Sequence, residues 1–520
     1  MRSKSILSVV LATLALFGAA GCKVTESDIE YWKGTVKGPG KIKAVLLSDN
    51  YDMSLRTKAA LALVEMEPRS NPQLDPVGEL QDALNDPRVS DETRRQLITD
   101  MVDGLERLMA GEETSGNQEE GPQQQQIRAK DAAFVLIGHA EGDAKQRLMR
   151  AVVQWYAEDF NGRNLAGNFS AEQVTRSLGA PAAEMLVDAL EPELPSPALV
   201  KLAELLGDVG TEETRARAGA RLVEIEIHME GDEFLDWLKG KVREQLRAVT
   251  AEGQEVDEGR VTSIAVLNRE NFINNGALPA MKHMNRVSAV SERLLAVAEV
   301  SEANEAITNR RTKALQALEG AATEAMLERL LTLALTPANP DGVRDYAFDR
   351  VGDIRSRSAL TRLWPLVEKS EDEAQRQRWR AGEMVLFIGG SDIVAEFIRR
   401  LPSEDEIKYE PEELEGYATR MSQMTPPPTA LMRTQLTSTN WWNRVIGLRF
   451  FERQGVESDI PAMERLKTDT AAVNGEAWER LEIENVGGVA EAAIEGLRER
   501  LEGGDDEDGE EESSDSEDGE

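Results

Sequence analysis

The chain has 520 residues, a net charge of −35 and only 5% aromatic residues. The phosphates of a nucleic acid would repel so acidic a protein, which excludes nucleic acid as a partner class but allows cationic partners. A chain this long exceeds a single core and is rich in helix-forming residues, so we expect several helical domains or one extended helical array.

The N-terminus predicts export. Arg2 and Lys4 precede an apolar run from Ile6 to Phe17, and small residues follow this run. The order is typical of a secretory signal peptide, and the run is shorter than the roughly 20 residues that span a bilayer.

Cys22, the only cysteine in the chain, follows the small residues directly. The stretch Phe17–Cys22 resembles the lipobox of bacterial lipoproteins, although Ala19 stands where that family usually has Leu. The resemblance implies that residues 1–21 are removed as a signal peptide and that Cys22 is lipidated. An ordinary signal peptide or membrane anchor with an incidental cysteine is the alternative.

Residues 22–43 contain several lysines and glycines, so we expect a lipidated tether that either contacts anionic headgroups or is a solvated linker. Lys23 follows the lipidation site directly. In enterobacterial lipoproteins Asp at this position retains the protein in the inner membrane, so Lys23 implies the outer membrane by resemblance. The expected location is therefore the bacterial cell envelope.

Between residues 44 and 501 the sequence predicts a succession of amphipathic helices, in which similar segments start at regularly spaced arginines. Arg311 and Arg344 are 33 residues apart, and Arg344 and Arg378 are 34 apart. Arg378 and Arg444 are 66 apart, which is twice 33. A period in the thirties indicates stacked helix–turn–helix units. Earlier members of the series are Arg56, Arg94, Arg128 and Arg215.

This pattern resembles HEAT-like, armadillo-type repeats, in which a basic residue opens a helix, Ala and Leu form its core and a Gly–Asp turn follows. The resemblance implies an all-α fold, an α-α superhelix or solenoid, over residues 44–501. Residues 225–290 fit the pattern least well. A non-repetitive helical protein is the alternative.

Several stretches interrupt or end the array. The polar residues 111–126 and the acidic, Gly-rich residues 250–262 predict flexible loops, and residues 423–429, with three prolines, predict a stiff break. Residues 502–520 carry 12 acids and no base, so we expect a disordered tail. Its expected role is solvation or spacing, and binding of a cation or a partner is the alternative.

The sequence offers no recognisable reaction centre. The histidines His139, His228 and His283 lack metal-ligand spacing, and no catalytic or phosphate-binding motif occurs. We therefore expect no enzyme activity, cofactor or metal. Trp441 and Trp442 form the most conspicuous aromatic pair. Core packing at a helix start and contact with a peptide or glycan are both open to them.

These observations predict a non-catalytic, protein-binding scaffold that is lipid-anchored in the cell envelope, because stacked helix pairs expose a long surface. An acidic face would favour a basic partner. The alternative is a glycan-binding protein or an enzyme on a helical toroid, with carboxylates converging beside Trp residues in a central cleft. A third reading is an envelope spacer without a specific partner.

Overall fold

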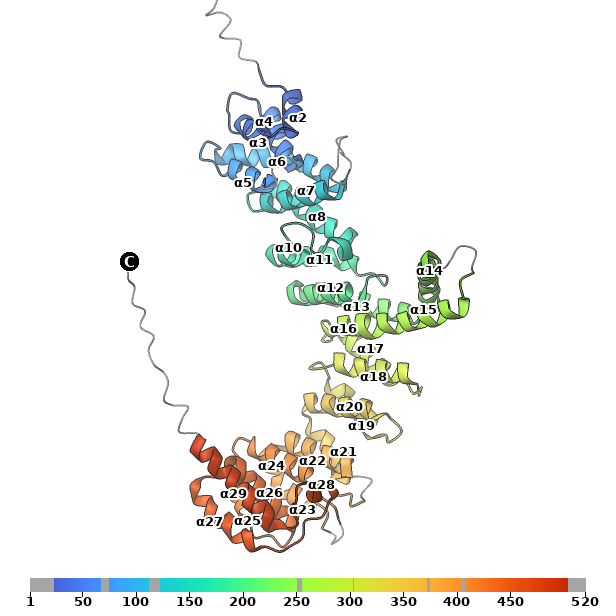
Figure 1. Cartoon of the computed structure of the whole chain (residues 1–520), viewed down its shortest axis with the longest axis vertical. Coiled ribbons are helices and arrows are strands. Elements are labelled where there is room, and N and C mark those ends of the chain that lie inside the picture. Colours follow the sequence, from blue (N-terminus) through green and yellow to red (C-terminus); the bar gives the residue numbers. More distant parts are fainter. Residues whose placement is uncertain are drawn as a thin grey trace, which may run out of the picture. The chain divides into compact units, whose positions relative to one another are not determined.

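The computed structural model describes residues 23–66, 74–111, 122–249, 255–302, 304–371, 375–403 and 407–503 (Figure 1). In this part of the chain helices are joined by turns, and the nearest approach to a β-sheet is an isolated bridge between Ala472 and Asn485. The all-α prediction is therefore confirmed. The chain divides into two compact units, Met1–Val290 and Ser291–Glu520.

The α-helices of unit 1 are α2 (Glu26–Lys33), α3 (Gly38–Leu46), α4 (Met53–Glu65), α5 (Pro76–Leu84), α6 (Asp91–Ala110), α7 (Pro122–Ile137), α8 (Gly142–Glu158), α9 (Phe160–Arg163), α10 (Ala171–Leu178), α11 (Ala180–Leu186), α12 (Ser196–Val209), α13 (Glu212–Glu230), α14 (Asp232–Val249), α15 (Glu258–Phe272) and α16 (Leu278–Lys282). The division between the units falls inside α17 (Ser288–Ala298).

The α-helices of unit 2 are α18 (Glu305–Ala317), α19 (Leu327–Leu335), α20 (Asp341–Ile354), α21 (Leu360–Val367), α22 (Gln375–Gly389), α23 (Val394–Arg400), α24 (Pro411–Ser422), α25 (Thr429–Gln435), α26 (Trp441–Gln454), α27 (Ile460–Glu464), α28 (Glu476–Arg480) and α29 (Val486–Gly503).

Unit 2 is built from stacked helix pairs. Several long helices pack against the short helix before them, as in α19–α20, α21–α22 and α25–α26. The long helices also form a continuous layer, because α18, α20, α22, α24, α26 and α29 each pack against the next in this order. This arrangement confirms the predicted helical-repeat solenoid within the unit, since each repeat buries its apolar face mainly against its neighbours.

The recurring arginines explain how the two helices of a pair are tied together. Nε of Arg56 donates to the carbonyl of Leu46 at 2.9 Å, and Nε of Arg311 donates to the carbonyl of Ala298 at 2.8 Å. Leu46 and Ala298 are the last residues of α3 and α17. The final carbonyls of a helix have no partner within the helix, so a buried guanidinium on the next helix satisfies them with a charge-assisted hydrogen bond.

Other members of the series repeat or vary this contact. Nε of Arg94 donates to the last carbonyl of α5, that of Leu84, at 2.7 Å. Nη1 of Arg444 donates to the carbonyl of Ser438 at 2.6 Å in the turn before its helix. Arg344 is an exception, because it pairs with Asp341 in its own helix. The sequence period therefore reports a structural contact and not a binding site.

The predicted tether over residues 22–43 is wrong for most of its length. Residues 26–33 and 38–46 form α2 and α3, and Ile29 and Ile42 are fully buried. Two of the lysines in this stretch form ion pairs with later helices: Lys33 pairs with Glu65 of α4, and Lys43 pairs with Glu79 of α5. Apolar residues at helical spacing outweigh the glycines here, because Gly38 and Gly40 lie in the first turn of a helix.

The predicted loops are shorter in the structure. Helix α7 begins at Pro122 and α15 at Glu258, so residues 122–126 and 258–262 are helical. Residues 112–121 and 250–254 lie outside the described part. Residues 423–428 join α24 to α25 without a helix, as the prolines suggested. Helix α29 runs to Gly503, two residues past the predicted end of the array, and the acidic tail from residue 504 lies outside the described part.

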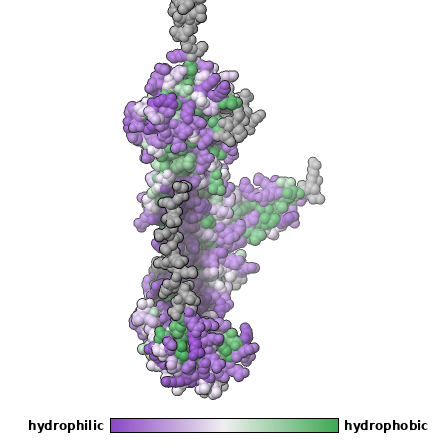
Figure 2. All heavy atoms as spheres, turned by 60° about the vertical axis from the view of Figure 1, so that its left-hand side comes forward, coloured by the Kyte–Doolittle hydropathy of each residue, from purple (hydrophilic) through white to green (hydrophobic). Residues whose placement is uncertain are grey.

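Residues 225–290, which fit the repeat least well, contain a long helical hairpin. Helices α14 and α15 pack against each other and extend away from the other helix pairs of unit 1 (Figure 1). Phe234, Trp237 and Phe272 make ring contacts at the hairpin base. Val249 and Leu267 are exposed, and apolar surface is visible on this projection (Figure 2). The repeat pattern fails here because a hairpin is inserted into the array.

The C-terminal residues of unit 2 fold back across a repeat. The backbone N–H of Tyr409 donates to the carbonyl of Asn474 at 3.0 Å, and Nε1 of Trp478 donates to the carbonyl of Tyr409 at 2.7 Å. The carboxylate of Glu410 accepts from the N–H groups of Glu476 and Ala477 at 3.0 and 2.9 Å. These contacts brace the start of α24 against α28, which satisfies the free amides at the N-terminus of α28.

Candidate partner-binding groove

A surface groove of about 380 Å³ runs along the long-helix layer of unit 2. It spans three successive long helices, α20, α22 and α24. Its lining combines apolar, acidic and basic side chains, namely Gly320, Phe348, Asp349, Gly352, Asp353, Arg355, Arg380, Glu383, Met384, Phe387 and Arg420.

The apolar part of the groove depends on a glycine. A Cβ atom at Gly352 would lie 3.2 Å from Cε of Met384, so the Met384 side chain lies directly over the backbone of α20. Phe348, one turn earlier on α20, is 4% exposed and belongs to the wall. A larger side chain at position 352 would therefore displace Met384 and occupy the groove.

The acidic side chains of the groove are partly removed from water. This loss of hydration raises the pKa of Asp349 and Glu383, although Arg380 near Asp349, and Arg420 and Arg380 near Glu383, oppose the shift. Arg380 itself lies 3.4 Å from Asp345. The lining holds three acids and three arginines, so the groove is close to neutral in a strongly acidic protein.

Phe387 forms the centre of the basic part. Its ring is 36% exposed, and the guanidinium carbons of Arg355 and Arg420 lie 4.8 and 5.2 Å from the ring centroid. These distances are typical of cation–π contacts. Arg355 ends α20 in the left-handed conformation, with φ of 54°. Across the described residues, neither guanidinium forms an ion pair with a carboxylate, although the charge of Arg420 acts on Glu383.

Sequence reasoning missed these three residues, although the repeat period contains a signal for them. Phe387 follows Arg355 by 32 residues, and Arg420 follows Phe387 by 33. They therefore occupy equivalent places near the ends of successive long helices, where stacking brings equivalent positions side by side. The chemical types differ at the three positions, so a search for similar segments does not select them.

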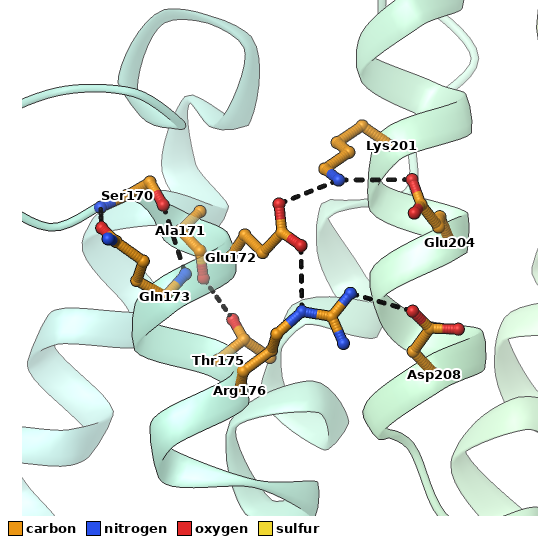
Figure 3. Close-up of polar contacts among 9 residues, drawn as sticks. All are labelled: Ser170, Ala171, Glu172, Gln173, Thr175, Arg176, Lys201, Glu204 and Asp208. Carbon is orange, nitrogen blue, oxygen red and sulfur yellow. Dashed lines mark hydrogen bonds and ion pairs between the residues drawn. The ribbon is translucent and has the colours of Figure 1, made fainter. Parts of the chain in front are cut away.

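Elsewhere, charged side chains are largely paired between neighbouring repeats, as unit 1 illustrates (Figure 3). Glu172 on α10 accepts from Arg176 and lies 2.9 Å from Lys201 on α12. Arg176 also pairs with Asp208 on α12 at 2.9 Å. The hydrogen bond from Lys201 lowers the pKa of Glu172. Such acids are compensated within the protein, so the net charge does not describe what a given surface offers a partner.

Trp441 and Trp442 belong to an aromatic cluster at the C-terminal brace, the contact between the start of α24 and α28. Trp442 is 4% exposed and stacks on Tyr409 with centroids 5.2 Å apart. It offers a partner almost no surface, so core packing is its role. Trp441 is half-buried and contacts Tyr409, Trp442 and Trp478 edge-on. A partner contact by Trp441 stays a prediction. Cys22 lies outside the described residues.

The histidines do not converge. His228 contacts the ring of Phe234 on α14, His139 follows the end of α7, and burial lowers the pKa of His283 near α12. Within the described ranges, no cluster of three or more His, Cys, Asp or Glu side chains has the geometry to hold a metal ion. In the same ranges, every helix is too short or too polar to cross a bilayer.

Comparison with known proteins gives only distant structural matches. No protein-family model matches the chain, and no curated protein matches it in sequence. The crystal structure of the karyopherin Kap121p matches with a TM-score of 0.38 and 13% identity, over 94% of this chain and 56% of that one. A crystal structure of importin beta matches with a TM-score of 0.27 and 14% identity, over 96% of this chain and 66% of that one. The chain thus spans about half the length of Kap121p, and similarity this low says nothing of function.

Proposed function

We propose that this protein is a non-catalytic, protein-binding scaffold that a lipid on Cys22 holds in the bacterial cell envelope. The observation that carries the binding role is the groove across α20, α22 and α24. The lipobox-like stretch at residues 17–22 supports the anchor, and Lys23 supports the outer membrane.

The groove has the properties of a site for an extended segment of another protein. It crosses consecutive repeats, so it offers several subsites along one line. It joins an apolar floor, made by Met384 over the backbone at Gly352, to charged groups at its edges. Partly dehydrated charges such as Glu383 discriminate between partners, because an unmatched charge costs binding energy.

The test is crosslinking in intact cells followed by mass spectrometry of proteins captured with the chain. The groove variant is Gly352→Leu, which fills the apolar floor. The matched control is Gly240→Leu, because a Cβ at this second helical glycine has no atom within 4 Å. Melting curves of both variants show whether they fold, and Asp349→Lys, on the exposed edge of the groove, is a second groove variant.

We expect Gly352→Leu and Asp349→Lys to lose a defined protein that the wild type and Gly240→Leu both capture. Cys22→Ala should move the protein out of the membrane fraction and leave the groove intact. Equal capture by Gly352→Leu and Gly240→Leu would refute the groove as the binding site. Capture of glycans in place of a protein would favour the helical-toroid alternative.

A further inference from the structure

The two arginines beside Phe387 differ from three arginines that link neighbouring repeats of unit 2. Arg329, Arg362 and Arg400 each pair with a glutamate of the preceding repeat, at 2.5, 2.8 and 2.7 Å. Arg355 and Arg420 instead face an aromatic ring at the groove edge, and neither forms an ion pair with a carboxylate among the described residues, although Glu383 is close enough to Arg420 for its pKa to be affected. Together they form a site with two positive charges and an exposed ring, which suits a carboxylate-bearing segment.

The chain itself contains such a segment next to this unit. Residues 504–520 carry 11 acidic side chains and no basic one, and they follow directly after α29. Helix α29 packs on α26, and α26 packs on α24, which bears Arg420. Packed helices lie about 8–10 Å apart, so α24 is about 20 Å from α29 across the layer. An extended segment of 17 residues reaches about 55 Å, which is more than this distance.

Tethering and charge both favour this segment over a free one. A segment joined by a short linker is present at its site at an effective concentration in the millimolar range. The folded part of the chain is also acidic, so the tail is repelled from most of the surface and attracted to cations that lack a partner. Attraction between exposed charges is screened by salt, so the contact should weaken as ionic strength rises.

We propose that the acidic tail, residues 504–520, lies in the groove with its carboxylates at Arg355 and Arg420, and that a partner must displace it. The tail is then an internal competitor that sets a threshold for partner binding. The competition rests on the proposed function, whereas the contact between tail and groove does not.

Site-specific photocrosslinking in the full-length chain tests the contact. The photoreactive p-benzoylphenylalanine replaces Phe387 in the groove, or Leu481 as a control, which is 53% exposed and lies outside the groove. The charge variant is Arg355→Gln with Arg420→Gln. Its matched control is Arg465→Gln with Arg480→Gln, because these two exposed arginines of unit 2 lie outside the groove and the substitution changes the net charge equally.

We expect position 387 to crosslink to peptides from residues 504–520 with a yield about fivefold or more above that of position 481, as a tethered contact requires. The groove charge variant and high salt should lower this yield severalfold, and the control charge variant should leave it unchanged. Equal yields from positions 387 and 481, or an unchanged yield in Arg355→Gln with Arg420→Gln, would overturn the proposal. Partner capture without a tail crosslink would refute only the tail contact, and a tail crosslink without partner capture would refute only the scaffold.

Discussion

The buried ion pair between α22 and α24 should make a large and non-additive contribution to stability. Arg378 and Glu413 are both fully buried, with Nε–Oε1 and Nη2–Oε2 distances of 2.8 and 2.9 Å. Nη2 of Arg378 also donates to the carbonyl of Lys408 at 2.8 Å, and the hydroxyl of Tyr417 donates to Glu413 at 2.9 Å. Replacing one partner leaves a buried charge without compensation, which costs about 3–5 kcal/mol.

The test is a double-mutant cycle on Arg378→Met and Glu413→Leu. Each single substitution should destabilise unit 2 by about 3–5 kcal/mol, whereas the double variant should lie within about 2 kcal/mol of the wild type, because a matched apolar pair has no charge to bury. Urea unfolding gives the free energies of unfolding. Hydrogen exchange of peptides from α22 and α24 shows whether the stability is lost at these two helices. For a urea slope of about 2–3 kcal/mol/M, each single variant should shift the midpoint by about 1–2.5 M.

The control is the exposed pair Arg498–Glu464, with side chains 49% and 47% exposed. Its substitution Glu464→Leu should cost less than about 1 kcal/mol. The reasoning fails if the buried single substitutions cost as little as this control. It also fails if the double variant loses the sum of the two single losses.

Three further predictions concern the groove, the aromatic cluster and the repeat arginines. Burial raises the pKa of Glu383, so protonated Glu383 contributes stability below the ordinary pKa of Glu, and this stability is lost as the pH rises through the folded-state pKa. Glu383→Gln should therefore gain stability relative to the wild type as the pH rises above the ordinary pKa of Glu, and calorimetry that shows a constant difference would contradict this. Trp442→Ala should cost about 3–5 kcal/mol and Trp441→Ala less, measured by urea unfolding, and equal small losses would place both side chains at the surface. Arg311→Met removes the donor to the carbonyl of Ala298, so the α17 amides should exchange faster and lose about 1.5–3 kcal/mol of protection free energy. An unchanged exchange rate would show that water replaces the guanidinium.

The sequence foretold the repeat architecture because its main contact is periodic. An arginine that reaches the end of the preceding helix recurs in several of the helix pairs, so Arg56 and Arg311 are visible as members of a series. The N-terminal helices are harder to predict, because the lysines and glycines of this stretch indicate a linker, whereas only the apolar spacing of residues such as Ile29 and Ile42 indicates helices that pack. The sequence indicates the inserted hairpin of α14 and α15 only indirectly, because the repeat period is lost over residues 225–290.

The groove was less predictable, because it depends on which charged side chains find partners. Arg362 and Arg420 each follow a threonine within a helix, yet Arg362 pairs with Glu328 and Arg420 faces Phe387. Pairing is decided by the offset between stacked helices, which a single sequence does not contain. For the same reason, the net charge predicted an acidic binding face, whereas the groove lining is close to neutral.

The C-terminal brace between α24 and α28 affects the order in which the repeats of unit 2 unfold. In a stack of repeats the terminal pair usually frays first, because it has a neighbour on one side only. Here Asn474 and Trp478 hold Tyr409 across more than 60 residues of sequence, so the last pair cannot detach while α24 remains in place. The terminal repeats should therefore open together as one cooperative block, and the acidic tail that leaves α29 is attached to a fixed end.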